Sequence, residues 1–171
     1  RSAAGLCFVG SHPIAGSEQS GIAFARPDLF KNSLCILTPG PAPATASHRV
    51  TVFWKSLGAA VKTMRPAVHD RTLGFTSHLP HAVAFAIMNT IQTKDLAFAG
   101  GGLKDTTRIA ASHPGLWSEI LLSNKKEVQK AIRRFSANLN RIHRDLSRRP
   151  DSLRRTLSAA QKKRTRWTNA A

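Results

Sequence analysis

The chain has 171 residues, of which 42% are hydrophobic, and its formal net charge is +17. This length and apolar content suffice for one domain and a little more and exclude wholesale disorder, and neither a membrane span nor a secretory leader is expected. Its two cysteines, Cys7 and Cys35, lie in apolar strand-like runs, which favours buried thiols in the cytoplasm over a disulfide or a metal site.

The first predicted element is a buried strand over residues 6–9 that ends at Gly10. A loop rich in glycine and polar residues follows, and ligands of open α/β sheets bind beyond the carboxyl ends of strands. His12 lies in this loop and can exchange a proton near neutral pH, while Pro13 stiffens the backbone beside it. An ordinary strand-to-helix turn with a surface histidine would have the same pattern.

A crossover unit is predicted next. Residues 34–38 form a second buried strand, Ser47 begins a helix as its N-cap, and residues 59–64 form a third strand. Gly58 ends the helix. This order is typical of neighbouring parallel strands joined by a helix. Four apolar residues recur there at helical spacing: Val50, Phe53, Trp54 and Leu57.

From Pro66 onward the sequence predicts helices only. A long helix over residues 67–92 should kink at Pro80, and the three glycines of residues 100–102 should break the chain. Two short helices should follow, over residues 103–111 and 114–122.

A longer helix is expected after Asn124. Its apolar positions repeat every seven residues, which is typical of helix packing in a core or across a dimer. Pro150 should end it, and Asp151 should cap a last helix that reaches about Arg164. The apolar positions are Val128, Ile132, Phe135, Leu139, Ile142 and Leu146.

The positive charge is concentrated in these last helices. Residues 125–171 contain 15 Lys or Arg and 3 Asp or Glu, so they carry +12 of the +17. Such a tail can bind nucleic acid or a membrane surface, although a solvated helix face is its commoner explanation. Because Phe135 and Trp167 are its only aromatic residues, nucleic-acid binding by base stacking has little support.

Two groups of residues could carry chemistry. On the long helix, Asp70, Ser77, His78 and His81 recur at three- to four-residue spacings and can share one face. The two histidines could in principle bind a metal ion, but no Cys or Glu completes a set, so no metal site is expected. A helix face that satisfies its own hydrogen bonds remains the alternative.

The second group begins with the glycine run. Three glycines permit close approach, and the helix start after them favours anions. The Arg108 guanidinium suits a carboxylate, and Asp105, one turn earlier, could orient it. A flexible hinge with an exposed ion pair is the alternative.

The segments GSHPIAGSEQSG, LTP, LGA, HDR, SHLPH and GGGLKDTTRIA occur in this order, followed by Trp117. Together they resemble prephenate and arogenate dehydrogenases of tyrosine biosynthesis, from about Cys7 to Asn124. The resemblance implies an α/β remnant, the end of a Rossmann-type nucleotide-binding domain over residues 1–64. An all-α helical dimerisation domain over residues 65–171 should follow it, and the protein should be a homodimer.

The resemblance also implies an activity. The family oxidises and decarboxylates prephenate to 4-hydroxyphenylpyruvate and transfers a hydride to NAD or NADP; arogenate is the alternative substrate. By this resemblance His12 takes the proton of the substrate hydroxyl, and Arg108 holds a substrate carboxylate. Trp117 matches a packing residue. Eight further positions match family positions that are expected to bind substrate. Ser17 and Glu18 match the pocket lining, and Asp70, Ser77, His78 and His81 match the interdomain helix, of which some face the pocket. Gly101 and Asp105 match a loop that crosses between subunits.

The sequence departs from the family in one respect. No Gly-x-Gly-x-x-Gly fingerprint occurs in the 171 residues, so we expect them to lack a complete cofactor site and to be part of a longer enzyme. An inert helical module that binds polyanions through its basic tail is the alternative.

Overall fold

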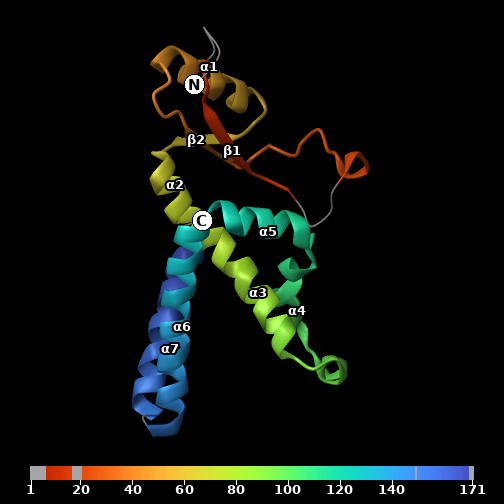
Figure 1. Cartoon of the computed structure of the whole chain (residues 1–171), viewed down its shortest axis with the longest axis vertical. Coiled ribbons are helices and arrows are strands. Elements are labelled where there is room, and N and C mark those ends of the chain that lie inside the picture. Colours follow the sequence, from red (N-terminus) through yellow and green to blue (C-terminus); the bar gives the residue numbers. More distant parts are fainter. Residues whose placement is uncertain (1–6, 17–20, 149, 170–171) are drawn as a thin grey trace. The chain divides into compact units, whose positions relative to one another are not determined.

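The computed structural model describes residues 7–16, 21–148 and 150–169, which form a small sheet and a series of helices (Figure 1). By their contacts, the described residues group into two compact units that divide between Val128 and Gln129. The first unit contains the whole sheet and most helices, and it therefore contains both groups of residues that the sequence singles out.

The three described strands form one sheet in the order β1 (Gly10–Ile14), β2 (Leu34–Thr38) and β3 (Ala60–Thr63). Strands β2 and β3 are parallel and are joined by α1 (Ala44–Ser56), which confirms the predicted crossover unit. Strand β1 runs antiparallel to β2. The fold is thus a short α/β part followed by helices.

The prediction for the first strand is wrong. Strand β1 lies at residues 10–14, so His12 and Pro13 are strand residues and not loop residues, and Cys7 is exposed. β1 pairs only with β2 in the described sheet, and an edge strand tolerates a proline that cannot donate a hydrogen bond. Pairing with β2 therefore overrides the stronger strand propensity of residues 6–9.

The core of the α/β part lies between α1 and the sheet. Cys35 and Leu37 of β2 are fully buried there with Ala59, and Val50 and Trp54 of α1 pack against them. Cys35 is thus buried, as predicted.

Helix α1 starts earlier than predicted. It begins at Ala44 after Pro43, with no side-chain cap, and not at Ser47. Phe53 and Leu57 are exposed, so the face that packs on the sheet is narrower than the apolar spacing suggested.

The predicted long helix consists of two α-helices, α2 (Pro66–Leu73) and α3 (Leu79–Thr90), joined by a π-helical segment, Gly74–His78. The irregularity therefore precedes Pro80. A proline inside a helix lacks one N–H donor and clashes with the carbonyl four residues earlier, and a wider π turn accommodates both. A Cβ at Gly74 would lie 3.2 Å from Cβ of Glu127, so this segment also permits close packing.

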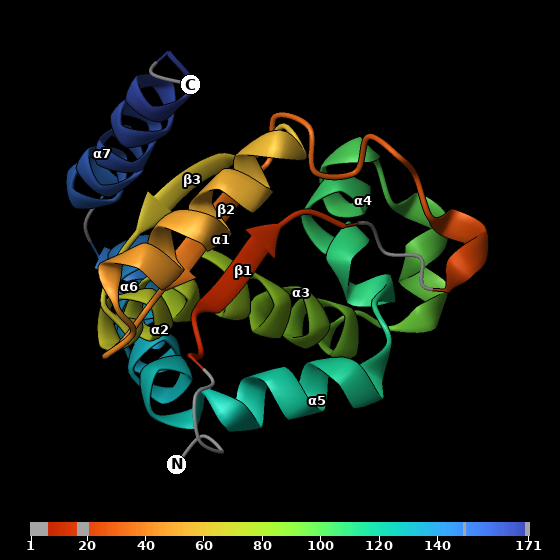
Figure 2. The same cartoon turned by 90° about the horizontal axis from the view of Figure 1, so that it is seen from above.

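The glycine run leads into α4 (Gly101–Thr107), and a 3-10 turn, Arg108–Ala111, continues it. Both pack against α3 (Figure 2). Helix α5 (Pro114–Ser123) follows; Pro114 lies in its first turn, and the His113 ring accepts a hydrogen bond from the amide of Leu116.

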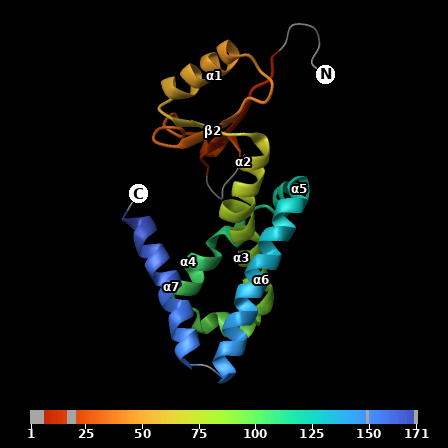
Figure 3. The same ribbon diagram turned by 90° about the vertical axis from the view of Figure 1, so that its left-hand side faces the viewer.

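The second unit contains most of α6 (Lys125–Arg148) and all of α7 (Pro150–Thr168), and the two helices form the arms of a V with opposite chain directions (Figure 3). The Ser152 hydroxyl of α7 donates to the buried Asp145 carboxylate of α6 at 3.0 Å. The last helix begins at Pro150 and extends beyond Arg164, the predicted end. None of the described helices has the length and apolar content to cross a membrane.

Candidate functional site

The direction of the His12 side chain follows from the register of β1. His12 pairs directly with Ile36, and directly paired residues of antiparallel strands share a face of the sheet. Ile36 alternates with Cys35 and Leu37, which face α1. His12 therefore points to the face opposite α1, where α2 packs on β2.

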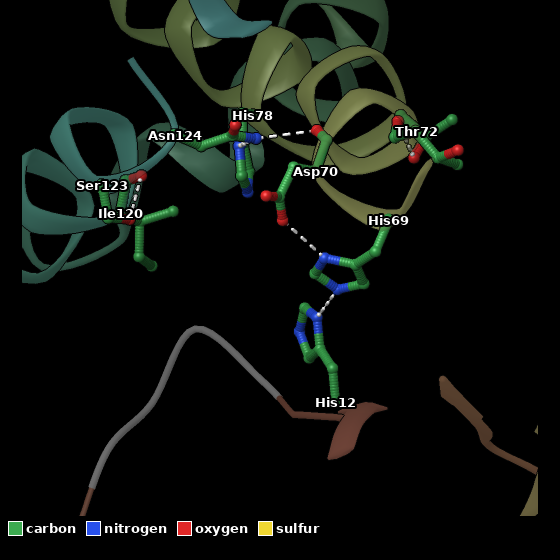
Figure 4. Close-up of polar contacts among 9 residues, drawn as sticks. His12, His69, Asp70, Thr72, His78, Ile120, Ser123 and Asn124 are labelled. Atoms are coloured by element: carbon green, nitrogen blue, oxygen red, sulfur yellow. Dashed lines mark hydrogen bonds and ion pairs between the residues drawn. The ribbon is translucent and has the colours of Figure 1, made fainter. Parts of the chain in front are cut away.

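On this face His12 meets α2. Its Nδ1 lies 2.9 Å from Nε2 of His69, and Nδ1 of His69 lies 2.9 Å from Oδ1 of Asp70 (Figure 4). The His69 side chain is 19% exposed and the Asp70 side chain 56%. Two imidazoles and a carboxylate thus form one hydrogen-bonded chain that runs from the sheet toward solvent.

Asn124, the C-cap residue of α5, contacts this site through its side-chain amide. Its side-chain amide donates to the carbonyl oxygen of Asp70 at 2.8 Å and to Nδ1 of His78 at 3.1 Å (Figure 4). Since the amide donates, Nδ1 of His78 accepts, and the proton of the neutral ring is on Nε2. His78 is buried and can offer this Nε2–H as a donor.

His81 lies on the first turn of α3. Its Nδ1 donates to the carbonyl oxygen of Ser77 at 3.0 Å, which leaves Nε2 as an acceptor in the neutral ring. The ring stacks on Trp117 with centroids 3.3 Å apart, and His78 meets the same indole edge-on at 6.3 Å. Trp117 therefore packs against two histidines of the site.

The imidazole rings of His12, His78 and His81 all favour the neutral form. Burial lowers the pKa of His12 below its usual 6.5, and the neighbouring His69 lowers it further. Burial also lowers the pKa of His78, with contributions from His12, His69 and His81, against an opposing effect of Asp70. The pKa of His81 is lowered by burial, although its bond to Ser77 opposes the shift. These rings can therefore act as acceptors or neutral donors at neutral pH.

The glycine group lies on a neighbouring element. Arg108 begins the turn after α4 and is exposed, as are Asp105 and Gly101. His81 lies on α3, and both α4 and the turn that contains Arg108 pack against α3. A Cβ added at any glycine of residues 100–102 would meet no atom within 4 Å, so packing within this chain does not require glycine there.

Most of the predicted site residues lie in the first unit, but two of them cannot be placed. Ser17 and Glu18 lie outside the described residues. The structure adds His69 and Asn124, which the sequence analysis did not select. His69 precedes a chosen residue, Asp70, but nothing local marks its contact with His12, and Asn124 carries no motif at all.

The arrangement suits proton transfer and hydrogen bonding to a polar ligand. His12 is a half-buried, neutral-favouring base whose Nδ1 is occupied by His69. No three His, Cys, Asp or Glu side chains of the described residues are grouped so that they could hold a metal ion.

Comparison with protein families matches almost the whole chain. Residues 65–159 match the family model described as prephenate dehydrogenase, dimerization domain, and residues 2–63 match the nucleotide-binding domain of the same family. The matches meet close to the end of β3.

Curated relatives agree with this assignment. Cyclohexadienyl dehydrogenase of Zymomonas mobilis is 33% identical over 143 residues, which cover 79% of this chain and 49% of the relative. Prephenate dehydrogenase of Bacillus subtilis is 37% identical over 142 residues, 79% of this chain and 38% of the relative. The chain thus spans half or less of the length of these relatives.

Solved structures show the same fold. Prephenate dehydrogenase from Aquifex aeolicus, in complex with hydroxyphenyl propionate and NAD+, matches with a TM-score of 0.86 and 40% identity over 93% of this chain and 58% of that one. Arogenate dehydrogenase from Synechocystis matches with a TM-score of 0.81 and 25% identity over 94% and 61%.

Proposed function

The chain belongs to the prephenate dehydrogenase family, and we propose that it provides the substrate side of an oxidoreductase that converts prephenate to 4-hydroxyphenylpyruvate. In this reaction the substrate hydroxyl loses its proton as the ring carbon that bears this hydroxyl loses a hydride. CO2 then leaves as the ring becomes aromatic, and the oxygen takes a proton back to give the phenol. The observation that carries the proposal is His12, a half-buried imidazole held by His69 beside a cluster of polar groups.

His12 acts as the general base. Its pKa is lowered chiefly by burial, so the ring is neutral at pH 7 and can accept the hydroxyl proton as the hydride departs. A base with a lowered pKa is a weaker base, but a larger fraction of it is deprotonated at neutral pH, which suits this reaction.

Arg108 holds a substrate carboxylate. Its planar guanidinium can bind a carboxylate through two parallel hydrogen bonds, which fixes orientation as well as charge. His78 and His81 offer a donor and an acceptor on the same side as His12, and Asp70, Ser77, Gly101 and Asp105 complete the pocket. Ser17 and Glu18 are proposed for the pocket on their match to the family motif.

The proposed cofactor is NAD or NADP, which would supply the hydride acceptor. The described connection from β2 to α1 does not fit the phosphates of such a cofactor. Backbone N–H groups and glycines normally cradle them, whereas this connection contains Pro39, Pro41 and Pro43, which have no N–H. We therefore assign no residue of this connection to the cofactor phosphates.

Residues 1–64 are proposed as the end of the nucleotide-binding domain and residues 65–171 as the helical domain through which two copies form a homodimer. The match to a dimerization domain supports this, as does the exposed apolar stripe of α6. We define this stripe by four exposed side chains of the helix: Ile132, Phe135, Leu139 and Leu146. A cytoplasmic location stays a prediction from the sequence.

The test combines catalysis with binding. Reduction of NAD+ and NADP+ is followed by absorbance in a longer enzyme that includes these residues, with prephenate and, separately, with arogenate. Binding of hydroxyphenyl propionate to the 171-residue chain is measured by calorimetry. We expect hydroxyphenyl propionate to bind and Arg108→Gln to weaken it. Turnover with arogenate but not prephenate would reassign the substrate.

Absence of turnover and of hydroxyphenyl propionate binding in folded protein would contradict the proposal. If the same protein then bound heparin in a steeply salt-dependent manner, the polyanion-binding module would be the better interpretation, since phosphate-like contacts weaken as salt rises.

A further inference from the structure

His69 lies between His12 and Asp70, and its two ring nitrogens contact both. His69 Nε2 is 2.9 Å from His12 Nδ1, and His69 Nδ1 is 2.9 Å from Asp70 Oδ1 (Figure 4). The three side chains come from two elements, β1 and α2, that the sheet register brings together. His69 itself is mostly buried, whereas Asp70 is more than half exposed.

The hydrogen-bond partners within the His12–His69–Asp70 series determine which ring nitrogens carry protons. An ionised carboxylate only accepts hydrogen bonds, so Nδ1 of His69 must carry the proton that faces Asp70. In the neutral ring, Nε2 of His69 is then an acceptor, and the proton between the two rings belongs to Nδ1 of His12. Nε2 of His12 is left with a free lone pair, the form that a general base requires.

We propose that His69 is a positioning residue that holds His12 in the Nδ1–H form and takes up that proton when Nε2 of His12 is protonated. This inference rests on the proposed function, because it assumes that His12 accepts a proton from the substrate hydroxyl.

The proton transfer balances. The substrate O–H bond breaks as an N–H bond forms at Nε2 of His12. The N–H bond at Nδ1 of His12 breaks as one forms at Nε2 of His69. The positive charge thereby moves from the half-buried His12 to His69, which hydrogen-bonds the Asp70 carboxylate.

The titratable groups packed around His12 and His69 favour one proton shared between these two rings. His78 from the π-helical segment and His81 from α3 are further imidazoles whose pKa values are lowered, and they add no negative charge. The Cys35 thiol of β2, which contacts the His12 backbone, has a pKa raised by burial and stays neutral. Among the described residues of this cluster, Asp70 is a carboxylate that hydrogen-bonds an imidazole and can balance a positive ring, and the ring it contacts is His69.

Nuclear magnetic resonance of the full chain with 15N-labelled histidine tests the tautomer directly. Two-bond proton–nitrogen correlations at pH above the histidine titrations should show His12 protonated at Nδ1. In His69→Leu we expect His12 to change to the Nε2–H form. In His69→Gln the amide oxygen can accept from Nδ1, so the wild-type tautomer should be retained.

Kinetics distinguish the role of His69 in holding the His12 tautomer from its role in taking up the His12 proton. Both His69→Leu and His69→Gln should lower kcat, by about 10- to 100-fold, since general-base catalysis contributes about 10²- to 10⁴-fold and only part of it depends on the relay. KM should change little. His48→Gln, an exposed histidine on α1, serves as the matched control and should leave both constants unchanged.

An Nε2–H tautomer for His12 in the wild type would overturn the proposal, as would an unchanged tautomer in folded His69→Leu. If that variant does not fold, Asp70→Asn provides the second test, because an amide that donates to His69 would reverse the protons along the chain. A confirmed tautomer together with no turnover of prephenate or arogenate and no binding of hydroxyphenyl propionate would refute the proposed function and the relay together. Turnover that is unaffected in His69→Gln would refute the relay alone.

Discussion

His12 pairs with Ile36 across β1 and β2, and this register directs the imidazole toward α2. A slip of one residue would turn His12 to the face that α1 covers and would separate it from His69. Gly10, at the start of β1, helps to fix the register, because it pairs with Thr38 so closely that a side chain has no room.

Gly10→Ala should therefore destabilise the first unit. The added Cβ would collide with the Thr38 side chain and lie 3.2 Å from the Thr38 carbonyl oxygen. We expect the free energy of unfolding to fall by about 1–3 kcal/mol, the usual cost of overpacking, as measured by urea denaturation. Gly102→Ala is the control: its Cβ meets open space, so stability should not fall. Equal losses in both variants would contradict the assigned register.

Replacing His12 should remove the general base without removing the substrate site. His12→Gln retains a polar side chain but cannot accept a proton, so kcat should fall by about 10²- to 10⁴-fold with a smaller change in KM. Steady-state kinetics with prephenate measures this, and circular dichroism checks that the variant is folded. Retention of wild-type kcat in folded His12→Gln would exclude His12 as the base.

Stability should decrease as the pH falls through the histidine range. His12, His78 and His81 have pKa values below their usual 6.5 in the folded chain, so near that pH the unfolded state binds more protons. The unfolding free energy is therefore highest above 6.5 and declines below it until the folded-state values are passed. Denaturation at pH 7.5 and 5.5 measures the difference. The triple variant with glutamine at these positions should show a flatter profile; an unchanged profile would mean that other groups cause it.

The sequence predicts some of this architecture well because the decisive information is local. Residues 34–38 are a continuous apolar run closed by Pro39, and β2 occupies the predicted positions. Strand β1 was misplaced because its residues, which include Ser11 and Pro13, have little strand propensity and are strand only through pairing with β2.

The candidate site, too, could be predicted only where a local sequence motif marks its residues. His12 could be selected from its glycine-containing motif, but His69 acts through a contact with a residue 57 positions away. Asn124 ends one helix and bonds to another part of the unit, and no periodicity signals that. Tertiary hydrogen bonds of this kind depend on the packing of β1 against α2, which residue spacing does not specify.

Arg108 should be needed for substrate affinity. Lysine keeps the charge but cannot form the two parallel bonds of a guanidinium, so Arg108→Lys should raise KM by about tenfold, and Arg108→Gln by more, because hydrogen bonds to charged groups contribute about 1.5–3 kcal/mol. Arg155→Lys, an exposed arginine on α7, is the matched control. Equal KM values for Arg108→Lys, Arg108→Gln and the wild type would exclude Arg108 from carboxylate binding.

The apolar stripe of α6 should mediate dimer formation. Its side chains are exposed in the single chain, with Leu139 53% and Leu146 66% accessible, and burying the exposed part of each against a partner would gain about 1–2 kcal/mol. Sedimentation at micromolar concentration should therefore show a dimer. Leu139→Glu should shift it toward monomer, because an unpaired carboxylate would be buried in the interface. Asn140→Glu introduces the same charge at an exposed polar position of α6 and should leave the dimer intact. A wild-type monomer at these concentrations would refute the proposed assembly.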